Sequence, residues 1–262
     1  MILVTGVGGF VGGKIMKTFR DVIPCPSLRG ASEDEVRRIV EESGADTVIH
    51  TAAIADIGTC EKFPEESYTA NVMLPVYLAR ACKGRKLVCF SSDQVYGGLS
   101  DGGPYSEETV KPANLYASHK LEMEERVLDI SPDAVMLRAE WMYDYYLKKS
   151  NYFMNVINAE ESISANPHQY RGITYVKEVA ENVENVIKLP GGVYNFGSET
   201  DASMYEITKE FVKLLGKSVR VERDESKRPN LWMRCDKARR YGVNFSSVMD
   251  GLKLCAEDYN YI

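Results

Sequence analysis

The chain has 262 residues, of which 44% are apolar, and its formal net charge is −6. This length fits one large domain or a domain with a lobe, and the apolar content is ordinary for a globular core. The acidic balance disfavours nucleic-acid and acidic-membrane partners, because the basic residues form only short runs such as Arg239-Arg240. No apolar run is long enough to span a membrane, and the chain begins in a predicted strand. We therefore expect a cytoplasmic protein.

The first predicted unit is a strand, a glycine-rich turn and a helix. Ile2-Leu3-Val4 is a short apolar run typical of a buried parallel strand, and apolar residues at helical spacing follow Lys14. The glycines between them are spaced G-x-x-G-x-x-G, rather than the commoner G-x-G-x-x-G, and an ordinary turn would look alike. If the turn cradles a pyrophosphate at the helix N-terminus, the cofactor contacts are Gly6, Gly8, Gly9, Phe10, Val11 and Gly12.

The segment after the second predicted strand favours NADP(H) over NAD(H). Dinucleotide folds often carry an acidic residue there to bind the adenosine ribose, and Val22–Arg29 contains none. Ser27 and Arg29 could instead accept a 2′-phosphate, although a solvated loop arginine explains Arg29 nearly as well. Further along, Ser32–Glu35 forms a predicted capping box, and Pro64 opens a predicted helix that ends near Ala81.

Two hydroxyl residues follow a buried strand at 86–90. Ser91 and Ser92 lie at its predicted C-terminal end, which is the edge where open parallel sheets bind ligands. The Ser92 hydroxyl could hold a substrate carbonyl oxygen. A serine that merely caps the next turn would show the same pattern.

A tyrosine and a lysine then lie one helical turn apart. Tyr116 and Lys120 share one face of a predicted helix. A free tyrosine has a pKa near ~10, and a neighbouring ammonium favours the phenolate, so we expect Lys120 to lower the pKa of Tyr116. Such a pair is weak evidence alone, but together with the glycine turn and Ser92 it indicates a nicotinamide-dependent oxidoreductase. Ser92, Tyr116 and Lys120 are the predicted catalytic residues, and Lys120 would also hold the nicotinamide ribose.

These motifs resemble those of the extended short-chain dehydrogenase/reductase superfamily, and within it those of the dTDP-4-dehydrorhamnose reductases. The similar stretches are 50–53, 69–72, 138–143, 169–174 and 228–230. The resemblance implies that Ala52, Ala53, Asn71 and Ser91 join the cofactor site, with Tyr116 and Lys120. It also implies a nucleotide-sugar substrate bound by Ser92, Asp93, Trp141, Gln169 and Arg228.

Three functions stay open at this point. The first is reduction of a nucleotide-linked 4-keto sugar, the second is epimerisation with the same residues, and the third is a non-catalytic cofactor-binding regulatory subunit. Dehydration is disfavoured, because Gln94 stands where related dehydratases carry a second acid. The histidines and cysteines show no metal-ligand spacing, so we expect no metal site. A homodimer is left open.

The alternation of strands and helices predicts an α/β fold, a Rossmann-type doubly wound parallel sheet with a small C-terminal substrate lobe. Residues 1–141 would form the dinucleotide-binding core, and 176–199 and 237–262 would return to it. The lobe would comprise 142–175 and 200–236.

Overall fold

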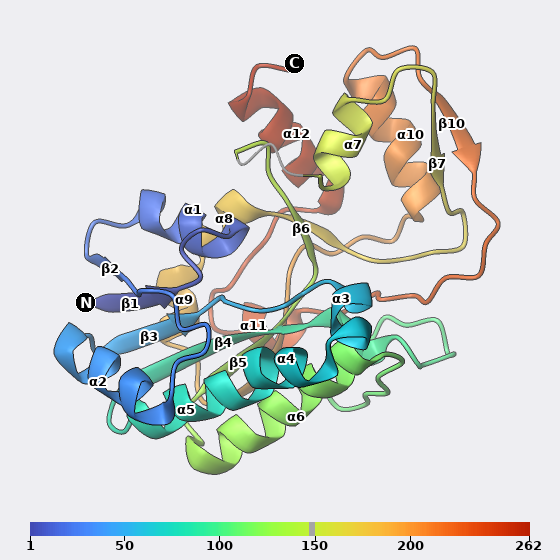
Figure 1. The fold of residues 1–262 in the computed structure, drawn as a ribbon. Coiled ribbons are helices and arrows are strands. Elements are labelled where there is room, and N and C mark those ends of the chain that lie inside the picture. Colours follow the sequence, from blue (N-terminus) through green and yellow to red (C-terminus); the bar gives the residue numbers. More distant parts are fainter. Residues whose placement is uncertain (147–149) are drawn as a thin grey trace.

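The centre of the molecule is a parallel sheet (Figure 1). The computed structural model describes residues 1–146 and 150–262. Six strands pair in the order β2-β1-β3-β4-β5-β9. Since the order reverses at β1, the crevice expected to bind a ligand opens between β1 and β3. The predicted Rossmann-type sheet is therefore confirmed, with strands β1 (Ile2–Thr5), β2 (Val22–Pro24), β3 (Thr47–His50), β4 (Lys86–Ser92), β5 (Val135–Ala139) and β9 (Gly192–Phe196).

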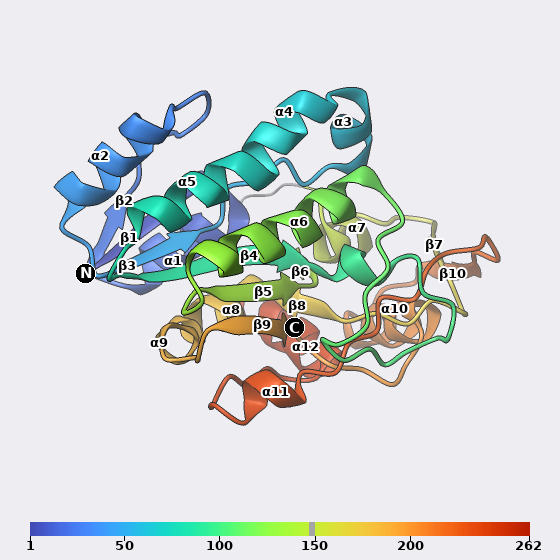
Figure 2. The same cartoon turned by 90° about the horizontal axis from the view of Figure 1, so that it is seen from below.

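Helices cover both faces of the sheet. Figure 2 looks onto the face covered by α2 (Glu33–Ser43), α5 (Leu74–Ala81) and α6 (Leu115–Ile130). The opposite face carries α1 (Phe10–Thr18), α8 (Val176–Glu181) and α9 (Val183–Ile187). Successive side chains of a strand point to opposite faces. In β4, Leu87 and Cys89 therefore pack under α5 and α6, whereas Val88 packs in the cluster on the other face.

Local signals explain where the helices begin. Ser32 and Glu35 form the predicted capping box of α2, and Pro64 is the first residue of α4 (Pro64–Tyr68). The helix then passes through a π-helical turn, η1 (Thr69–Met73), before it continues as α5. π-helical turns are rare and often mark functional sites. Shorter helices complete this half of the fold, namely α3 (Ile57–Lys62), η2 (Asp93–Tyr96) and α11 (Asp236–Arg239).

A lobe with its own apolar core lies at one end of the sheet (Figure 1). Phe153 of α7 (Tyr152–Ile157), Phe211 of α10 (Met204–Leu214) and Leu252 of α12 (Val248–Asp258) are fully buried in that core. Two small parallel pairs complete it, β6 (Trp141–Tyr143) with β8 (Ile173–Tyr175), and β7 (Ser162–Ala165) with β10 (Arg220–Arg223).

The packing of α12 corrects one predicted boundary. We expected the whole of 237–262 to return to the Rossmann core. Ala238 and Val243 do pack there. α12 instead joins the lobe, because the apolar face with Val248, Leu252 and Cys255 packs in the lobe core beside α10 and β8. Within residues 1–146 and 150–262, no helix combines the length and the apolar character that a membrane crossing requires.

Candidate active site

The glycine turn after β1 has no room for side chains at two positions. Gly6 has a φ of +68°, and a Cβ atom there would lie 2.7 Å from Thr51 Oγ1. A Cβ on Gly12 would lie 2.5 Å from the carbonyl oxygen of Gly6. At Gly8, by contrast, no described atom lies within 4 Å of such a Cβ, so this backbone faces open space. The turn therefore packs tightly against β3 on one side and stays open to a ligand on the other.

The N-terminus of α1 suits an anion. Gly9 is its N-cap, and within the described residues no side chain caps the helix and no acidic residue stands in its first turn. The first backbone N–H groups of a helix lack partners inside it, and the helix dipole favours negative charge there. Phe10 and Val11 begin this helix and are half-buried. The predicted glycine residues thus fit the pyrophosphate of a dinucleotide.

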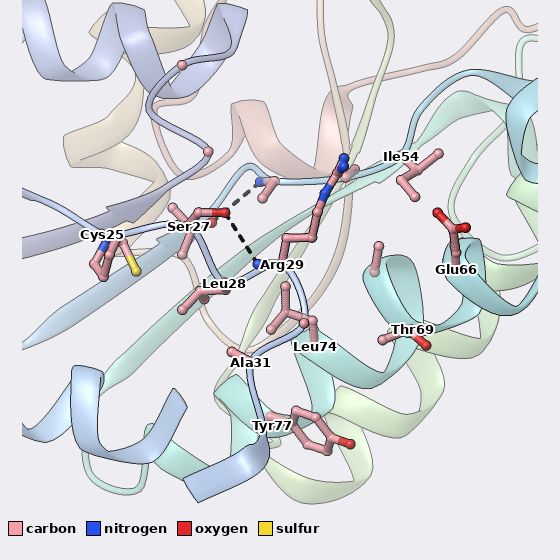
Figure 3. A pocket seen from close by; sticks show the side chains of 18 of the residues that line it. Cys25, Ser27, Leu28, Arg29, Ala31, Ile54, Glu66, Thr69, Leu74 and Tyr77 are labelled. Atoms are coloured by element: carbon pink, nitrogen blue, oxygen red, sulfur yellow. Dashed lines mark hydrogen bonds between the residues drawn. The ribbon is translucent and has the colours of Figure 1, made fainter. Parts of the chain in front are cut away.

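A cavity of about 740 Å³ continues from this turn (Figure 3). Its walls come from the ends of β1, β2 and β3 and from the helix that carries α4 and η1. Gly6, Gly8, Arg29, Ala52 and Ala53, which the sequence predicts as cofactor contacts, line it. No sequence pattern marked most of the other lining residues, among them Cys25, Pro26, Leu28, Ile54, Thr69, Leu74 and Tyr77.

The charges in this cavity are of both signs. Arg29 is exposed, and its backbone N–H donates to Ser27 Oγ at 3.4 Å. Figure 3 shows the Arg29 side chain extending into the cavity from the loop after β2. Glu65 and Glu66 line the opposite wall from α4. A phosphate placed beside Arg29 would therefore be attracted on one side and repelled on the other.

Asn71 acts on the backbone around the cavity. Its side chain is fully buried in η1. Asn71 Oδ1 accepts from Ile54 N at 3.0 Å, and Nδ2 donates to Ile54 O at 2.9 Å. Both ends of the amide are thus bonded to the loop after β3, and the predicted cofactor contact of Asn71 stays a prediction. Asn71 holds Ile54, which does line the cavity.

The three predicted catalytic residues meet where β4 ends and α6 begins. Asn114 caps α6 and accepts from Ala117 N at 2.9 Å. Tyr116 and Lys120 are both buried, and Lys120 Nζ lies 5.8 Å from the centre of the Tyr116 ring. Lys120 Nζ also donates to the carbonyl oxygen of Phe90 at 2.8 Å. Burial lowers the pKa of Lys120 to about 8, because the charged form loses its hydration.

The expected lowering of the Tyr116 pKa is absent, which corrects the sequence prediction. Burial raises the pKa of Tyr116 above its ordinary value. A hydrogen bond with Ser92 opposes this rise, and the negative charge of Asp93 adds to it. The expectation failed because helical spacing reveals the neighbouring ammonium but not the loss of water around the phenol. Tyr116 therefore keeps its proton near neutral pH, as a general acid requires.

The two serines at the end of β4 have different surroundings. Ser92 Oγ donates to Asp93 Oδ1 at 3.1 Å, next to Tyr116. Ser91 Oγ donates to Glu124 Oε1 at 2.5 Å. The Ser91 hydroxyl is thus directed away from Ser92, since neighbouring side chains of a strand alternate. The predicted cofactor contact of Ser91 stays a prediction.

The predicted substrate residues divide into two groups. Asp93 and Trp141 lie together, joined by Arg171, whose guanidinium is 2.6 Å from Asp93 and 5.4 Å from the Trp141 ring. Trp141 is 40% exposed, which is unusual for so large an apolar side chain. Gln169 donates to the carbonyl oxygen of Pro229 at 3.2 Å. Arg228 pairs with Asp224 at 2.8 Å within its own loop.

Comparisons with known proteins agree with this geometry. dTDP-4-dehydrorhamnose reductase of Mycolicibacterium smegmatis is 33% identical over 151 residues, which cover 54% of this chain and 46% of that protein. Methionine adenosyltransferase 2 subunit beta of Xenopus laevis is 29% identical over 232 residues, which cover 78% of this chain and 69% of that protein. The chain thus spans about half the length of the first of these relatives.

Solved structures show the same fold. The dTDP-4-dehydrorhamnose reductase of Clostridium acetobutylicum superposes with a TM-score of 0.89 at 24% identity, over 99% of each chain. The Bacillus anthracis enzyme in complex with NADP gives a TM-score of 0.86 at 22% identity, over 98% of this chain and 97% of that chain. A family model described as the RmlD substrate binding domain matches residues 1–248. The chain therefore belongs to the RmlD substrate binding domain family.

Proposed function

We propose that this protein reduces a nucleotide-linked 4-keto sugar with NADP(H). The observation that carries the proposal is the meeting of Ser92, Tyr116 and Lys120 at the carboxyl edge of β4. A dinucleotide cradle begins at the end of β1 in the same sheet. Relatives named as dTDP-4-dehydrorhamnose reductases support the substrate class.

The residues divide the chemistry among them. The cofactor, when bound, supplies the hydride. Ser92 holds the carbonyl oxygen of the substrate by a hydrogen bond, and Tyr116 donates its phenolic proton to that oxygen. The raised pKa of Tyr116 keeps the proton available at neutral pH. Lys120 places a positive charge beside the ring and compensates the negative charge left on the phenolate.

A panel of nucleotide-linked 4-keto sugars, incubated with NADPH and followed by product analysis, tests this function. Net consumption of NADPH with formation of the 4-hydroxy sugar is the expected result. An isomerised sugar without net consumption would instead show an epimerase.

A regulatory subunit is the second candidate, because the methionine adenosyltransferase subunit aligns over more of this chain than the reductase does. Tight NADP binding, no turnover of any sugar and co-purification of a partner enzyme would favour that function. The complete set of Ser92, Tyr116 and Lys120 favours catalysis.

The preference for NADPH over NADH rests on Arg29 in the cavity wall. Because a phosphate bonded to a guanidinium is worth more than a neutral contact, we expect Arg29→Ala to weaken NADPH binding roughly tenfold, about 1.4 kcal/mol. NADH binding should stay unchanged. Fluorescence titrations with both cofactors measure the effect, and Arg37→Ala on the exposed side of α2 is the matched control. Tighter binding of NADH, unaffected by Arg29→Ala, would reverse the assignment.

A further inference from the structure

A chain of interactions runs from the lobe to the candidate catalytic serine. Arg171 lies just before β8, and Asp93 is the first residue after β4. Arg171 Nη2 and Asp93 Oδ2 are 2.6 Å apart, and their side chains are 13% and 4% exposed. The other oxygen of Asp93 accepts from Ser92 Oγ at 3.1 Å. A residue of the lobe is therefore bonded, through one carboxylate, to the hydroxyl that would hold the substrate.

The guanidinium is held on other sides as well. Its centre lies 5.4 Å from the Trp141 ring, which is a cation–π distance. Glu140 is buried nearby, and the positive charge of Arg171 opposes part of the rise that burial causes in the pKa of Glu140. Glu140 Oε2 accepts from Thr174 Oγ1 at 2.9 Å. Gly172 and Gly197 leave no space beside the Glu140 carboxyl for even a methyl group, so that carboxyl is confined.

The pairing matters for charge near the reacting oxygen. In carbonyl reduction, negative charge develops on the oxygen that Ser92 would hold. Asp93 is bonded to Ser92, so an unpaired Asp93 carboxylate would oppose that charge at close range in a poorly hydrated site. Arg171 cancels much of the Asp93 charge and holds the carboxylate in one place. Ser92 has a single hydroxyl proton, so it must leave Asp93 to donate to the substrate oxygen. A carboxylate paired with Arg171 competes less strongly for that proton.

We propose that Arg171 is a positioning residue, which neutralises and holds Asp93 so that the Ser92 hydroxyl can turn from that carboxylate to the substrate oxygen. The proposal rests on the proposed reductase function. It adds a role for a lobe residue that the sequence analysis did not select. Arg171 acts through Asp93, and its contribution should therefore disappear when position 93 carries no charge.

A double-mutant cycle tests the proposal with Arg171→Met, Asp93→Asn and the double variant. We expect Arg171→Met to lower kcat roughly 10- to 100-fold, with little change in NADPH affinity. The double variant should lose much less than the product of the two single losses, because the neutral amide that replaces the carboxylate needs no counter-charge. Arg171→Lys should recover most of the lost kcat, and Arg220→Met, on the exposed face of β10, should leave kcat unchanged.

Two results would overturn the proposal. In one, the double variant loses as much kcat as the product of the two single losses. In the other, the kcat of Arg171→Met stays within twofold of the wild-type value. If Arg171→Met does not fold, Arg171→Lys and the charge-free double variant complete the comparison. Urea unfolding of the same four proteins tests the Arg171–Asp93 pair independently of the proposed reductase function. If the wild-type protein reduces no sugar, the reductase assignment fails, and coupled unfolding midpoints still establish the Arg171–Asp93 pair. If the changes in the unfolding midpoint simply add in the double variant, Arg171 and Asp93 do not interact as a pair.

Discussion

Ser91 and Ser92 are neighbours on β4, yet they belong to two buried polar networks of different character. On the Ser91 side, the Glu124 carboxylate accepts a hydrogen bond from the Ser91 hydroxyl and forms an ion pair with Arg138 at 2.7 Å. Arg138 also donates to Tyr96 Oη at 2.9 Å and to the carbonyl oxygen of Glu107 at 2.9 Å. Tyr96 in turn donates to Asn195 at 2.6 Å, which ties η2 to β9. This network is nearly saturated with hydrogen bonds.

The Ser92 side is less complete. Among the described residues, the buried Arg171 Nε and Glu140 Oε1 lack hydrogen-bond partners. Native proteins leave few buried polar atoms without partners, and each calls for an explanation. The saturated network joins strands and helices of the Rossmann core. The incomplete one lies around Arg171, which reaches Asp93 and Trp141 of the candidate site. We interpret the first network as stabilising the fold and the second as part of the candidate site.

Matched tyrosine substitutions on the two sides give the largest expected contrast. Tyr116→Phe removes the proposed acid, so turnover should fall ~10²–10⁴-fold while NADPH binding and unfolding stay near wild type. Tyr96→Phe breaks the saturated network, so the free energy of unfolding should fall by about 1–3 kcal/mol with turnover nearly unchanged. Steady-state kinetics, NADPH fluorescence and urea unfolding measure all three quantities. Equal effects of the two variants on turnover would abolish the distinction between the networks.

Lys120 should give the Ser92 side its own pH dependence. Burial lowers the pKa of Lys120 to about 8, so the ammonium loses its proton as the pH rises through that value. Turnover should then fall about tenfold per pH unit above it. The unfolded chain keeps this proton to a higher pH, so the contribution of Lys120 to stability rises with pH in that interval. The fall in turnover above this pH therefore cannot result from unfolding caused by the deprotonation of Lys120.

Lys120→Arg is the control for this profile, because arginine stays charged. Its turnover, although lower, should be flat through pH 8. A decline at the same pH in both proteins would assign the titration to another group.

The smallest expected effect concerns Glu140, whose Oε1 is one of the buried atoms without a partner. Burial raises the pKa of Glu140 well above its ordinary value, so the folded protein holds this proton to a higher pH than the unfolded chain. The stability it contributes is full at low pH and is lost as the pH rises. Glu140→Gln removes that loss and should raise the free energy of unfolding at neutral pH by about 1 kcal/mol. Urea unfolding between pH 5 and 8 measures it, with the exposed Glu41→Gln as control. If the free energy of unfolding of Glu140→Gln depends on pH as it does in the wild-type protein, Glu140 is not the group that causes this dependence.

The sequence by itself determined the fold class and the position of the glycine turn. Apolar strands, capping residues and glycine spacing are local signals, and they act over a few residues. They therefore placed β1, the glycine turn, the start of α2 and the tyrosine–lysine pair correctly. They could also place Ser91 and Ser92 at a strand end.

The tertiary structure alone decided which lobe residue reaches Asp93, beside Ser92. Arg171 and Asp93 come from distant parts of the chain, and no local pattern joins them. The raised pKa of Tyr116, the role of Asn71 in holding Ile54 and the place of α12 in the lobe likewise depend on burial. Burial is a property of the packed chain, because it depends on neighbours that are remote in sequence. For this reason spacing revealed the reacting groups, but not the charges and surroundings that set their behaviour.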